Sequence, residues 1–557
     1  MDAVGVRRTP GPDSARPEQG RPSRHRVKGP LVAFFSFWLL AVALQVAGGC
    51  YRADFDGYPD EAAHYITGLM VHDYLLSGNL LHPMAYAENY YLHYPKVAIG
   101  HWPPVFYVLQ AAWMLLFGPS RISILLLMAA ITAAVASVMF AVGRRIAGPW
   151  WAAGAGVVYV CVPMVQANTG MVMAESLLAL GGLLAAYSFA EYLETGATAP
   201  ALWFGAWSAF TILVKGNGWS LALLPPLALA LSRQWHRLLD WRLWAAAAVA
   251  TLAVPWQLAT IHMVENGWEL SWGLSYVRTS VSDFGPILAD SLGFGILSLA
   301  LLGLLGIVFL RPIESRRSPI LASVGALALA TLLFHAFVPA NLDSRRLILA
   351  LPAILLLAAG GVARLRQLAG PRLATGLALA ATAWFALRVF TIPHKPVDCS
   401  SDDARFAMQI APGSSDRLLI SGSSSSEGAF ISAVAMRENR PGHYVLRASK
   451  MLLDSEWSGA GERLRYSISM AEEKLESWGV SVMVLAPDGP SSPPGLTLAR
   501  SIIAAYPDLW KPVAPIPGCG ATPRLFRYAG PRRPNPSPVE ADLRRMLGRK
   551  ITSGPAN

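Results

Sequence analysis

The chain has 557 residues, of which 54% are hydrophobic and only 15% are charged, with a mean hydropathy of +0.40. Because a soluble domain carries about 25% charged residues, this composition excludes an ordinary soluble protein and predicts a membrane protein. The net charge of +11 comes from 46 Lys and Arg against 35 Asp and Glu. In a membrane protein such an excess gathers in cytoplasmic loops against anionic lipids, so we expect membrane lipids and no nucleic acid as partners.

The N-terminal residues 1–29 are rich in Pro, Gly and Arg, which predicts a disordered, basic cytoplasmic tail. The apolar run Gly29–Gly49 follows and lacks a clear small-residue cleavage site. We expect this run to remain as the first membrane span and to carry the chain outward.

A polar segment, residues 51–121, separates this span from the next apolar runs and contains the acid pair Asp60–Glu61. Its five histidines lack HxxxH or HExxH spacing, so a divalent metal is possible but not indicated, and no cofactor is required. They are His64, His72, His82, His93 and His101. Within the segment, the run Trp102–Gly118 is short and opens with two prolines. We interpret it as a helix lying at the membrane interface.

Ten further apolar runs follow, uncharged except for Asp290 in one of them, and several are near the roughly 20 residues that a spanning helix needs. They are Ile122–Val142, Trp150–Gln166, Ser176–Ala190, Ala199–Val214, Trp219–Leu231, Leu243–His262, Ile287–Leu310, Ser318–Val338, Leu347–Val362 and Leu373–Leu387. With the first span this predicts an all-α polytopic membrane protein of about eleven spans, in a range of 11–13.

The placement of Trp102–Gly118 decides the side of every later loop. If it lies at the interface, four basic loops become cytoplasmic, as the positive-inside rule requires; if it spans, all four violate the rule. These loops are Arg144–Arg145, 232–242, Arg311–Arg317 and Arg364–Arg372.

The segment after Thr391 alternates strand-like and helix-like runs, which predicts a soluble α/β domain with a largely parallel sheet over residues 392–530. The topology exports this domain from the cytoplasm. Cys399 and Cys519 bracket it and are predicted to form a disulfide, since the outer compartment permits one. Residues 531–557 are expected to form a flexible tail.

The same topology collects a small set of ionisable groups at the outer rim of the membrane, where such groups are costly and tend to be functional. Basic residues on this side oppose the positive-inside bias, and a lipid phosphate would give a reason for them. The acids are Asp54, Asp56, Asp60, Glu61, Glu88, Glu175, Glu265, Glu269, Asp283 and Asp343, and the bases are Arg52, Lys96, Arg121, Lys215, Arg278, Arg345 and Arg346.

Several motifs in the region from about residue 30 to 390 resemble GT-C glycosyltransferases. Within this group the chain resembles relatives of the dolichyl-phosphate-mannose protein mannosyltransferases and of the bacterial aminoarabinose transferase that modifies lipid A. The resemblance implies an 11- to 13-helix fold, a polyprenyl-phosphate sugar donor and an active site facing away from the cytoplasm. The motifs are PDEAAHY, HWPPVFYVLQAAWMLLFGPSR, GRRIAGPWWAAGAGVVYVCVPMV, MVMAESLLAL, LVKGNGWSLALLPPLAL and SRRLILALPAILLLAAGG.

Carried over to this sequence, the resemblance places the catalytic acid pair at Asp60 and Glu61, with Asp60 as the reacting carboxylate. It places a second outer acid at Glu175 and the donor-binding arginine at Arg345. Arg346 stands where relatives have Tyr. Lys96 resembles the basic residue that meets the lipid phosphate in the aminoarabinose enzymes, and Arg121 matches the arginine closing an LFGxSR-like turn.

Glycosyl transfer from a lipid phosphate needs the same residue types. The leaving group is an anion, so cations that stabilise its developing charge matter more than a general acid. Lys96, Arg121 and Arg345 are the candidates, with Arg346 beside them. The acceptor hydroxyl needs a base, and a carboxylate with a raised pKa can serve. We assign this role to Asp60, and the reaction then inverts the anomeric carbon. His101, Lys215 and Asn217 are candidates for the substrate pocket.

Simpler interpretations remain open. Asp60, Glu61 and Glu175 could only favour helix N-termini, and Arg345–Arg346 could only extend toward the interface. The function predicted is an inverting glycosyltransferase of a bacterial inner membrane, with its N-terminus cytoplasmic and its C-terminal domain periplasmic or extracellular. A lipid, glycan or protein hydroxyl, or a phosphate, is the acceptor. The alternatives are a secondary transporter and a non-catalytic scaffold with an exported binding domain.

Overall fold

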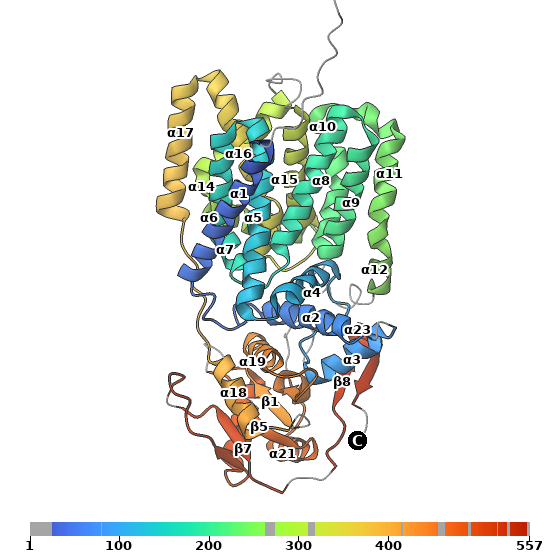
Figure 1. Ribbon diagram of the computed structural model, residues 1–557, viewed down its shortest axis with the longest axis vertical. Coiled ribbons are helices and arrows are strands. Elements are labelled where there is room, and N and C mark those ends of the chain that lie inside the picture. The colour runs from blue at the N-terminus through green and yellow to red at the C-terminus, as the bar shows by residue number, and fades with distance from the viewer. Residues whose placement is uncertain are drawn as a thin grey trace, which may run out of the picture.

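The computed structural model describes residues 25–78, 81–261, 273–309, 318–413, 416–454, 463–487, 492–520, 522–531 and 535–553. Most of the expected N-terminal tail, residues 1–24, and the basic loop 311–317 lie outside these ranges. Figure 1 shows a helical bundle, a smaller α/β domain at one end of it, and a layer of helices between the two.

The bundle follows the expected spans in order. Its elements are α1 (His25–Ala47), α5 (Arg121–Ile146), α6 (Pro149–Cys161), α7 (Pro163–Thr169), α8 (Glu175–Thr195), α9 (Thr198–Val214), η1 (Gly216–Leu223), α10 (Leu224–Ser232), η2 (Trp235–Leu239), α11 (Trp241–Ala250), η3 (Thr251–Ala253), α12 (Val254–Ala259), α14 (Leu274–Phe309), α15 (Ser318–Phe337), η4 (Ser344–Leu349), α16 (Leu351–Leu368), α17 (Pro371–Trp384) and η5 (Phe385–Val389).

Among the described residues, six helices are long and apolar enough to cross a membrane: α1, α5, α8, α14, α15 and α16. The pair α6 and α7 would form a seventh span, bent by 64° where Pro163 cannot continue the hydrogen-bond ladder. The other expected spans are shorter or broken helices, so the number eleven stays a prediction. The integral-membrane, mainly helical architecture is confirmed.

Three helices form the layer between the bundle and the α/β domain: α2 (Pro59–Leu76), α3 (Pro83–His93) and α4 (Val105–Phe117). The 13 residues of α4 are fewer than the roughly 20 that a span requires. Helix α4 packs along α2 in this layer, which supports the interfacial placement of Trp102–Gly118.

The α/β domain is built on a five-stranded sheet of order β2-β1-β5-β7-β6. The pairs β1–β2 and β1–β5 are parallel, but β5–β7 and β6–β7 are antiparallel, so the sheet is mixed rather than largely parallel. The reason is that β7 follows β6 through a loop whose described residues form no helix, and it returns antiparallel between β5 and β6. The elements are α18 (Ser400–Ile410), β1 (Arg417–Ser421), α19 (Ser424–Arg437), β2 (Tyr444–Arg447), α20 (Ala448–Met451), β3 (Leu453–Asp454), β4 (Arg463–Leu464), α21 (Ile468–Ser477), β5 (Val480–Leu485), α22 (Pro494–Ala505), β6 (Trp510–Pro512) and β7 (Leu525–Tyr528).

The C-terminal segment differs from the flexible tail expected for residues 531–557. Its described part forms the antiparallel hairpin of β8 (Glu540–Leu543) and β9 (Arg549–Thr552), with the short helix α23 (Arg544–Leu547) between them. Leu543 and Ile551 are buried, and Arg549 pairs with Glu88 of α3. Apolar burial and this ion pair hold the hairpin against the middle layer.

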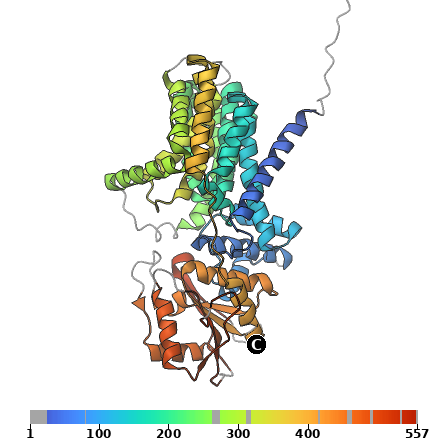
Figure 2. The same ribbon diagram turned by 90° about the vertical axis from the view of Figure 1, so that its left-hand side faces the viewer.

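The α/β domain contacts the middle layer through α19, which packs on α2. A Cβ at Gly428 of α19 would lie 2.8 Å from Cβ of Ala62, so glycine is what permits this close approach. Figure 2 shows the domain directly beyond the middle layer, on the side away from the bundle.

Candidate active site

Helix α2 begins at the predicted acid pair. Pro59 occupies its first turn with Asp60 and Glu61, in keeping with the preference of Pro and acids for helix N-termini. Successive residues of a helix are about 100° apart, so the two carboxylates leave α2 in different directions. The Asp60 side chain is 27% exposed and that of Glu61 is fully buried.

Asp60 meets Arg345, which lies 285 residues later in η4. Arg345 Nη1 donates to Asp60 Oδ2 at 2.8 Å, and its Nε donates to Asp343 Oδ2 at 3.0 Å. The guanidinium lies 4.1 Å from the centre of the Tyr58 ring and donates to the Tyr58 hydroxyl at 3.1 Å. Tyr58 in turn donates to Asp343 at 2.9 Å. Three residues thus fix the planar fork of Arg345.

Glu175, the first residue of α8, joins the same cluster. One of its carboxylate oxygens lies 3.6 Å from Arg345 Nη1 and accepts a hydrogen bond from Lys215 Nζ. Lys215 lies directly before η1, where the chain leaves α9. The predicted residues Asp60, Glu175, Lys215 and Arg345 therefore meet in one place, between the bundle and the middle layer. We call these four, with Tyr58 and Asp343, the charged cluster.

The charges of the cluster set its protonation. Burial raises the pKa of the Asp60 carboxyl, but Arg345, with Lys215, lowers it by more, so this pKa lies below its ordinary value. Burial lowers the pKa of Arg345, and Glu175 and Asp60 raise it to a net value above the ordinary one. Asp60 is therefore ionised at neutral pH, although the raised carboxylate pKa expected from its role as a base is not observed.

Glu61, predicted as the second member of the catalytic pair, lies outside the charged cluster. Its Oε1 accepts a hydrogen bond from Lys395, and its Oε2 accepts one from the Gly57 amide at 2.9 Å. Lys395 belongs to the linker that leads to the α/β domain, and its amide donates to Gly48 at the end of α1. Glu61 thus fastens the linker to α2.

Lys96, predicted to hold the donor phosphate, lies instead at the contact with the α/β domain. Its ammonium donates to the carbonyl of Ser424 at 2.8 Å and to the hydroxyl of Ser424 at 2.9 Å, where α19 begins. Burial and the nearby Arg447 lower the pKa of Lys96 to about 7. The negative charges of Glu427 and Asp60 oppose this lowering.

The other two predicted phosphate ligands are also engaged elsewhere. Arg121 pairs with Asp54 and donates to the Ser401 hydroxyl at 2.7 Å, which ties α5 to the start of α18. Arg346 follows Arg345 but donates to the carbonyl of Asn341. Burial and the positive charge of Arg345 lower the pKa of Arg346. Arg346 therefore lies beside the charged cluster, and its side chain contacts the loop that precedes η4.

Two of the three predicted pocket residues lie near the charged cluster. Lys215 belongs to it, and Asp60 and Lys215 are the charged groups that act on the His101 ring, whose pKa burial lowers to about 4. The His101 ring lies against Trp102, with centroids 4.5 Å apart. Asn217, half-buried, lies two residues after Lys215 in η1.

Sequence reasoning missed the roles of Tyr58, His64 and Lys395. Tyr58 lies two residues before the acid pair, and burial raises its pKa to about 12, so it is a hydrogen-bond donor. His64 lies one turn after Asp60, a spacing that places both on one face of α2. Tyr58 does not stand out by residue type, and His64 was weighed only as a metal ligand, together with the other histidines. Lys395 had no signal, since its partner is far away in the chain.

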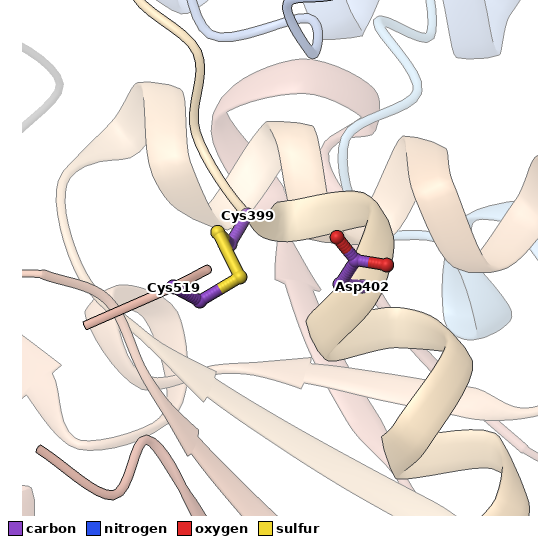
Figure 3. Close-up of side chains that lie close together, drawn as sticks. All are labelled: Cys399, Asp402 and Cys519. Atoms are coloured by element: carbon purple, nitrogen blue, oxygen red, sulfur yellow. A yellow bond between two sulfur atoms is a disulfide. The ribbon is translucent and has the colours of Figure 1, made fainter. Parts of the chain in front are cut away.

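The Cys399–Cys519 pair forms a disulfide, with 5.8 Å between the two Cα atoms, and links α18 to the loop before β7 (Figure 3). These sulfurs and Asp402 are, among the described residues, the one group close enough to share a metal ion. A disulfide sulfur is not a thiolate, and the thiolate is the form that binds metals. The residues present therefore do not fit a metal site.

No protein-family model and no curated protein matches the sequence. Solved structures do match its fold. ArnT from Cupriavidus metallidurans in the apo state is 15% identical with a TM-score of 0.57, covering 91% of this chain and 100% of that one. ArnT bound to undecaprenyl phosphate is 16% identical with a TM-score of 0.58, covering 90% and 98%. The mycobacterial arabinofuranosyltransferase AftD is 16% identical with a TM-score of 0.50, covering 94% and 43%. The chain therefore has the GT-C fold that the resemblance implied.

Proposed function

We propose that this protein is an inverting glycosyltransferase that moves a sugar from a polyprenyl phosphate to an acceptor hydroxyl on the non-cytoplasmic face of the membrane. The observation that carries the proposal is the meeting of Asp60, Glu175, Lys215 and Arg345 from four distant segments. The GT-C fold and the undecaprenyl phosphate bound to ArnT support the donor class.

The donor phosphate binds to Arg345 and Lys215 in this proposal. Both cations are already oriented by carboxylates, so little conformational entropy is lost when the phosphate engages them. As the phosphate takes a share of Arg345, the pair between Arg345 and Asp60 weakens. Because that pair is what lowers the pKa of Asp60, donor binding raises this pKa and makes Asp60 a better base.

The chemical step is a single displacement. The acceptor oxygen attacks the anomeric carbon from the side opposite the phosphate, and its proton passes to Asp60. The bond between the anomeric carbon and the phosphate oxygen breaks, and that oxygen keeps the electron pair. Arg345 and Lys215 stabilise the additional negative charge on the released polyprenyl phosphate. One displacement inverts the anomeric configuration.

The side of the membrane is inferred from the α/β domain. This domain carries the Cys399–Cys519 disulfide, which is typical of an oxidising compartment, and its α19 packs on α2 next to Asp60. We therefore place the charged cluster on the periplasmic side of a bacterial inner membrane. The acceptor is a lipid, glycan or protein hydroxyl that reaches the cluster from that side.

Label transfer tests the function. The purified protein is incubated with radiolabelled polyprenyl-phosphate sugars and a cell-envelope extract, and the molecule that gains the label is identified. Asp60→Asn serves as the inactive variant, and Asp508→Asn, whose carboxylate is 98% exposed in the α/β domain, serves as the matched control. Transfer by the wild type and Asp508→Asn, but not by Asp60→Asn, is the expected result. No transfer from any donor would contradict the proposal.

The same assay tests the expectation that no metal cofactor is required. We expect transfer to survive treatment with EDTA, because Arg345 and Lys215 supply the positive charge that a divalent ion would otherwise provide. Loss of transfer with EDTA and its return with added Mg²⁺ or Mn²⁺ would contradict this expectation.

A further inference from the structure

His64 is a buried histidine beside the charged cluster that the proposed mechanism leaves without a role. It follows Asp60 by four residues on α2, and its side chain is 1% exposed. Its ring lies against Trp102, with centroids 4.1 Å apart, and meets the edge of Phe106 at 5.4 Å. These aromatic contacts fix the plane of the imidazole.

The hydrogen bond between His64 and Tyr107 couples the positions of their two protons. Nδ1 lies 2.8 Å from the hydroxyl of Tyr107 in α4. Burial lowers the pKa of His64 to about 3, so the ring is neutral, and burial raises the pKa of Tyr107, so the phenol keeps its proton. The phenol can donate to Nδ1 or accept a hydrogen bond from it; we infer that it donates, and the imidazole proton then stays on Nε2.

This Nε2 is buried and has no hydrogen-bond partner among the residues that the structure describes. Four members of the charged cluster act on the ring through their charges. They are Asp60, Lys215, Glu175 and Arg345. A second buried atom of the cluster, Glu175 Oε2, likewise has no hydrogen bond within the described chain. Buried polar groups are nearly always paired, so two such atoms beside one charged cluster indicate a place that a ligand or a water completes.

We propose that His64 is a donor-binding residue whose Nε2–H hydrogen bonds to an oxygen of the bound sugar-phosphate headgroup. This inference rests on the proposed function, because it takes the polyprenyl-phosphate sugar as the ligand. A neutral N–H suits a sugar hydroxyl or a phosphate oxygen without adding charge to the cluster. Tyr107 acts through His64: it holds the tautomer that donates.

Two substitutions separate this contact from packing. In His64→Asn, the side-chain amide occupies the place of Nδ1 and keeps the bond to Tyr107, but the shorter side chain has nothing at the place of Nε2. In His64→Gln, the side-chain amide reaches the place of Nε2 and can still donate. His72→Asn is the matched control, since His72 is buried on the same helix and bonds to Asp73 away from the cluster.

The experiment measures dissociation constants in detergent for three probes: undecaprenyl phosphate, undecaprenyl-phosphate arabinose and undecaprenyl-phosphate mannose. We expect His64→Asn to weaken binding about tenfold, the size of one lost hydrogen bond, with His64→Gln and His72→Asn close to wild type. Weakening of the two sugar carriers alone assigns the contact to the sugar, and equal weakening of all three assigns it to the phosphate.

Several outcomes overturn the inference. If His64→Asn binds all three probes with unchanged affinity, His64 makes no hydrogen bond to the donor. Equal losses in His64→Asn and His64→Gln, with lowered melting temperatures, show that the ring serves packing alone. If the wild type binds none of the probes, the proposed function falls and the contact falls with it. If it binds them but transfers no sugar, the failure lies in the proposed reaction and not in His64.

Discussion

Asp60 and Glu61 are neighbours in the chain, but their charges are balanced in different ways. Asp60 shares one arginine with other carboxylates, whereas Glu61 is paired with a lysine. Asp60 lies in a cluster where Arg345 contacts Asp60, Asp343 and Glu175, and its side chain is 27% exposed. Glu61 is fully buried and pairs with Lys395. In the charged cluster, an incoming anion can replace a carboxylate as a partner of Arg345. The Glu61–Lys395 pair is buried and is not open to a ligand.

The difference shows that two adjacent residues in the first turn of α2 have separate roles, one in the proposed reaction and one in stabilising the fold. The shared guanidinium gives the Asp60 side a partially open site where an arriving phosphate can compete. The Glu61–Lys395 pair instead holds the linker to the α/β domain, so its contribution is to stability. Substitutions at the two positions should therefore separate turnover from folding.

The largest effect is expected for Asp60→Asn. The amide cannot accept the acceptor's proton, so kcat should fall about 10³-fold, within the range for loss of a general base. The melting temperature should fall only slightly, because Asn keeps the size of the side chain and Arg345 keeps Asp343 and Glu175 as partners. Single-turnover transfer of labelled sugar, together with thermal unfolding in detergent, measures both. Asp60→Asn with undiminished turnover would remove the assignment of the base.

Glu61→Gln should produce the opposite result. Removal of one charge from a fully buried pair leaves Lys395 uncompensated, which should destabilise the protein by about 3 kcal/mol. Turnover per folded molecule should stay near wild type. The double variant Glu61→Gln with Lys395→Met should recover part of the stability, as a thermal-unfolding double-mutant cycle would measure. A large loss of kcat in well-folded Glu61→Gln would return Glu61 to the catalytic machinery.

Arg345→Lys should have a smaller effect on the same reaction. Lysine keeps the charge but loses the planar fork that contacts Asp60, Asp343 and Tyr58 at once. We expect kcat/KM to fall about 50-fold, or roughly 2 kcal/mol in transition-state free energy. Arg346→Lys is the matched control and should change kcat/KM by less than about threefold, since Arg346 points to Asn341. Equal losses in the two variants would contradict the separation drawn between the two arginines.

The smallest effect, counted per pH unit, concerns Lys96, a buried lysine that, unlike Lys395, bonds to neutral oxygens of Ser424. Burial and Arg447 lower its folded-state pKa to about 7, while an unfolded chain keeps the ordinary value of about 10.4. Between these values the unfolded state binds a proton that the folded state lacks, so stability should rise with pH, by at most about 1.4 kcal/mol per pH unit. Lys96→Met should lose this part of the rise between pH 7 and 10. Identical pH dependence in both proteins would contradict it.

Much of the fold follows from local sequence patterns. Long uncharged runs can satisfy their backbone hydrogen bonds within a helix, and the alternating runs after Thr391 can do so only in a sheet with covering helices. The direction of the last strands was not predictable, because β7 pairs with β5 through contacts that no local pattern encodes. The C-terminal hairpin was missed for the same reason: its stability depends on burial of Leu543 and Ile551 and on Glu88.

The sequence by itself determined that this is a membrane protein with an acid pair at the start of a polar segment and a few basic residues near the same rim. Only the tertiary structure decided which of those charges meet. Arg345 and Lys215 reach the acids of the charged cluster, whereas Lys96, Arg121 and Arg346 are bound elsewhere. The physical reason is that the interaction between charges depends on their separation in space, and the packing of helices far apart in the chain sets that separation.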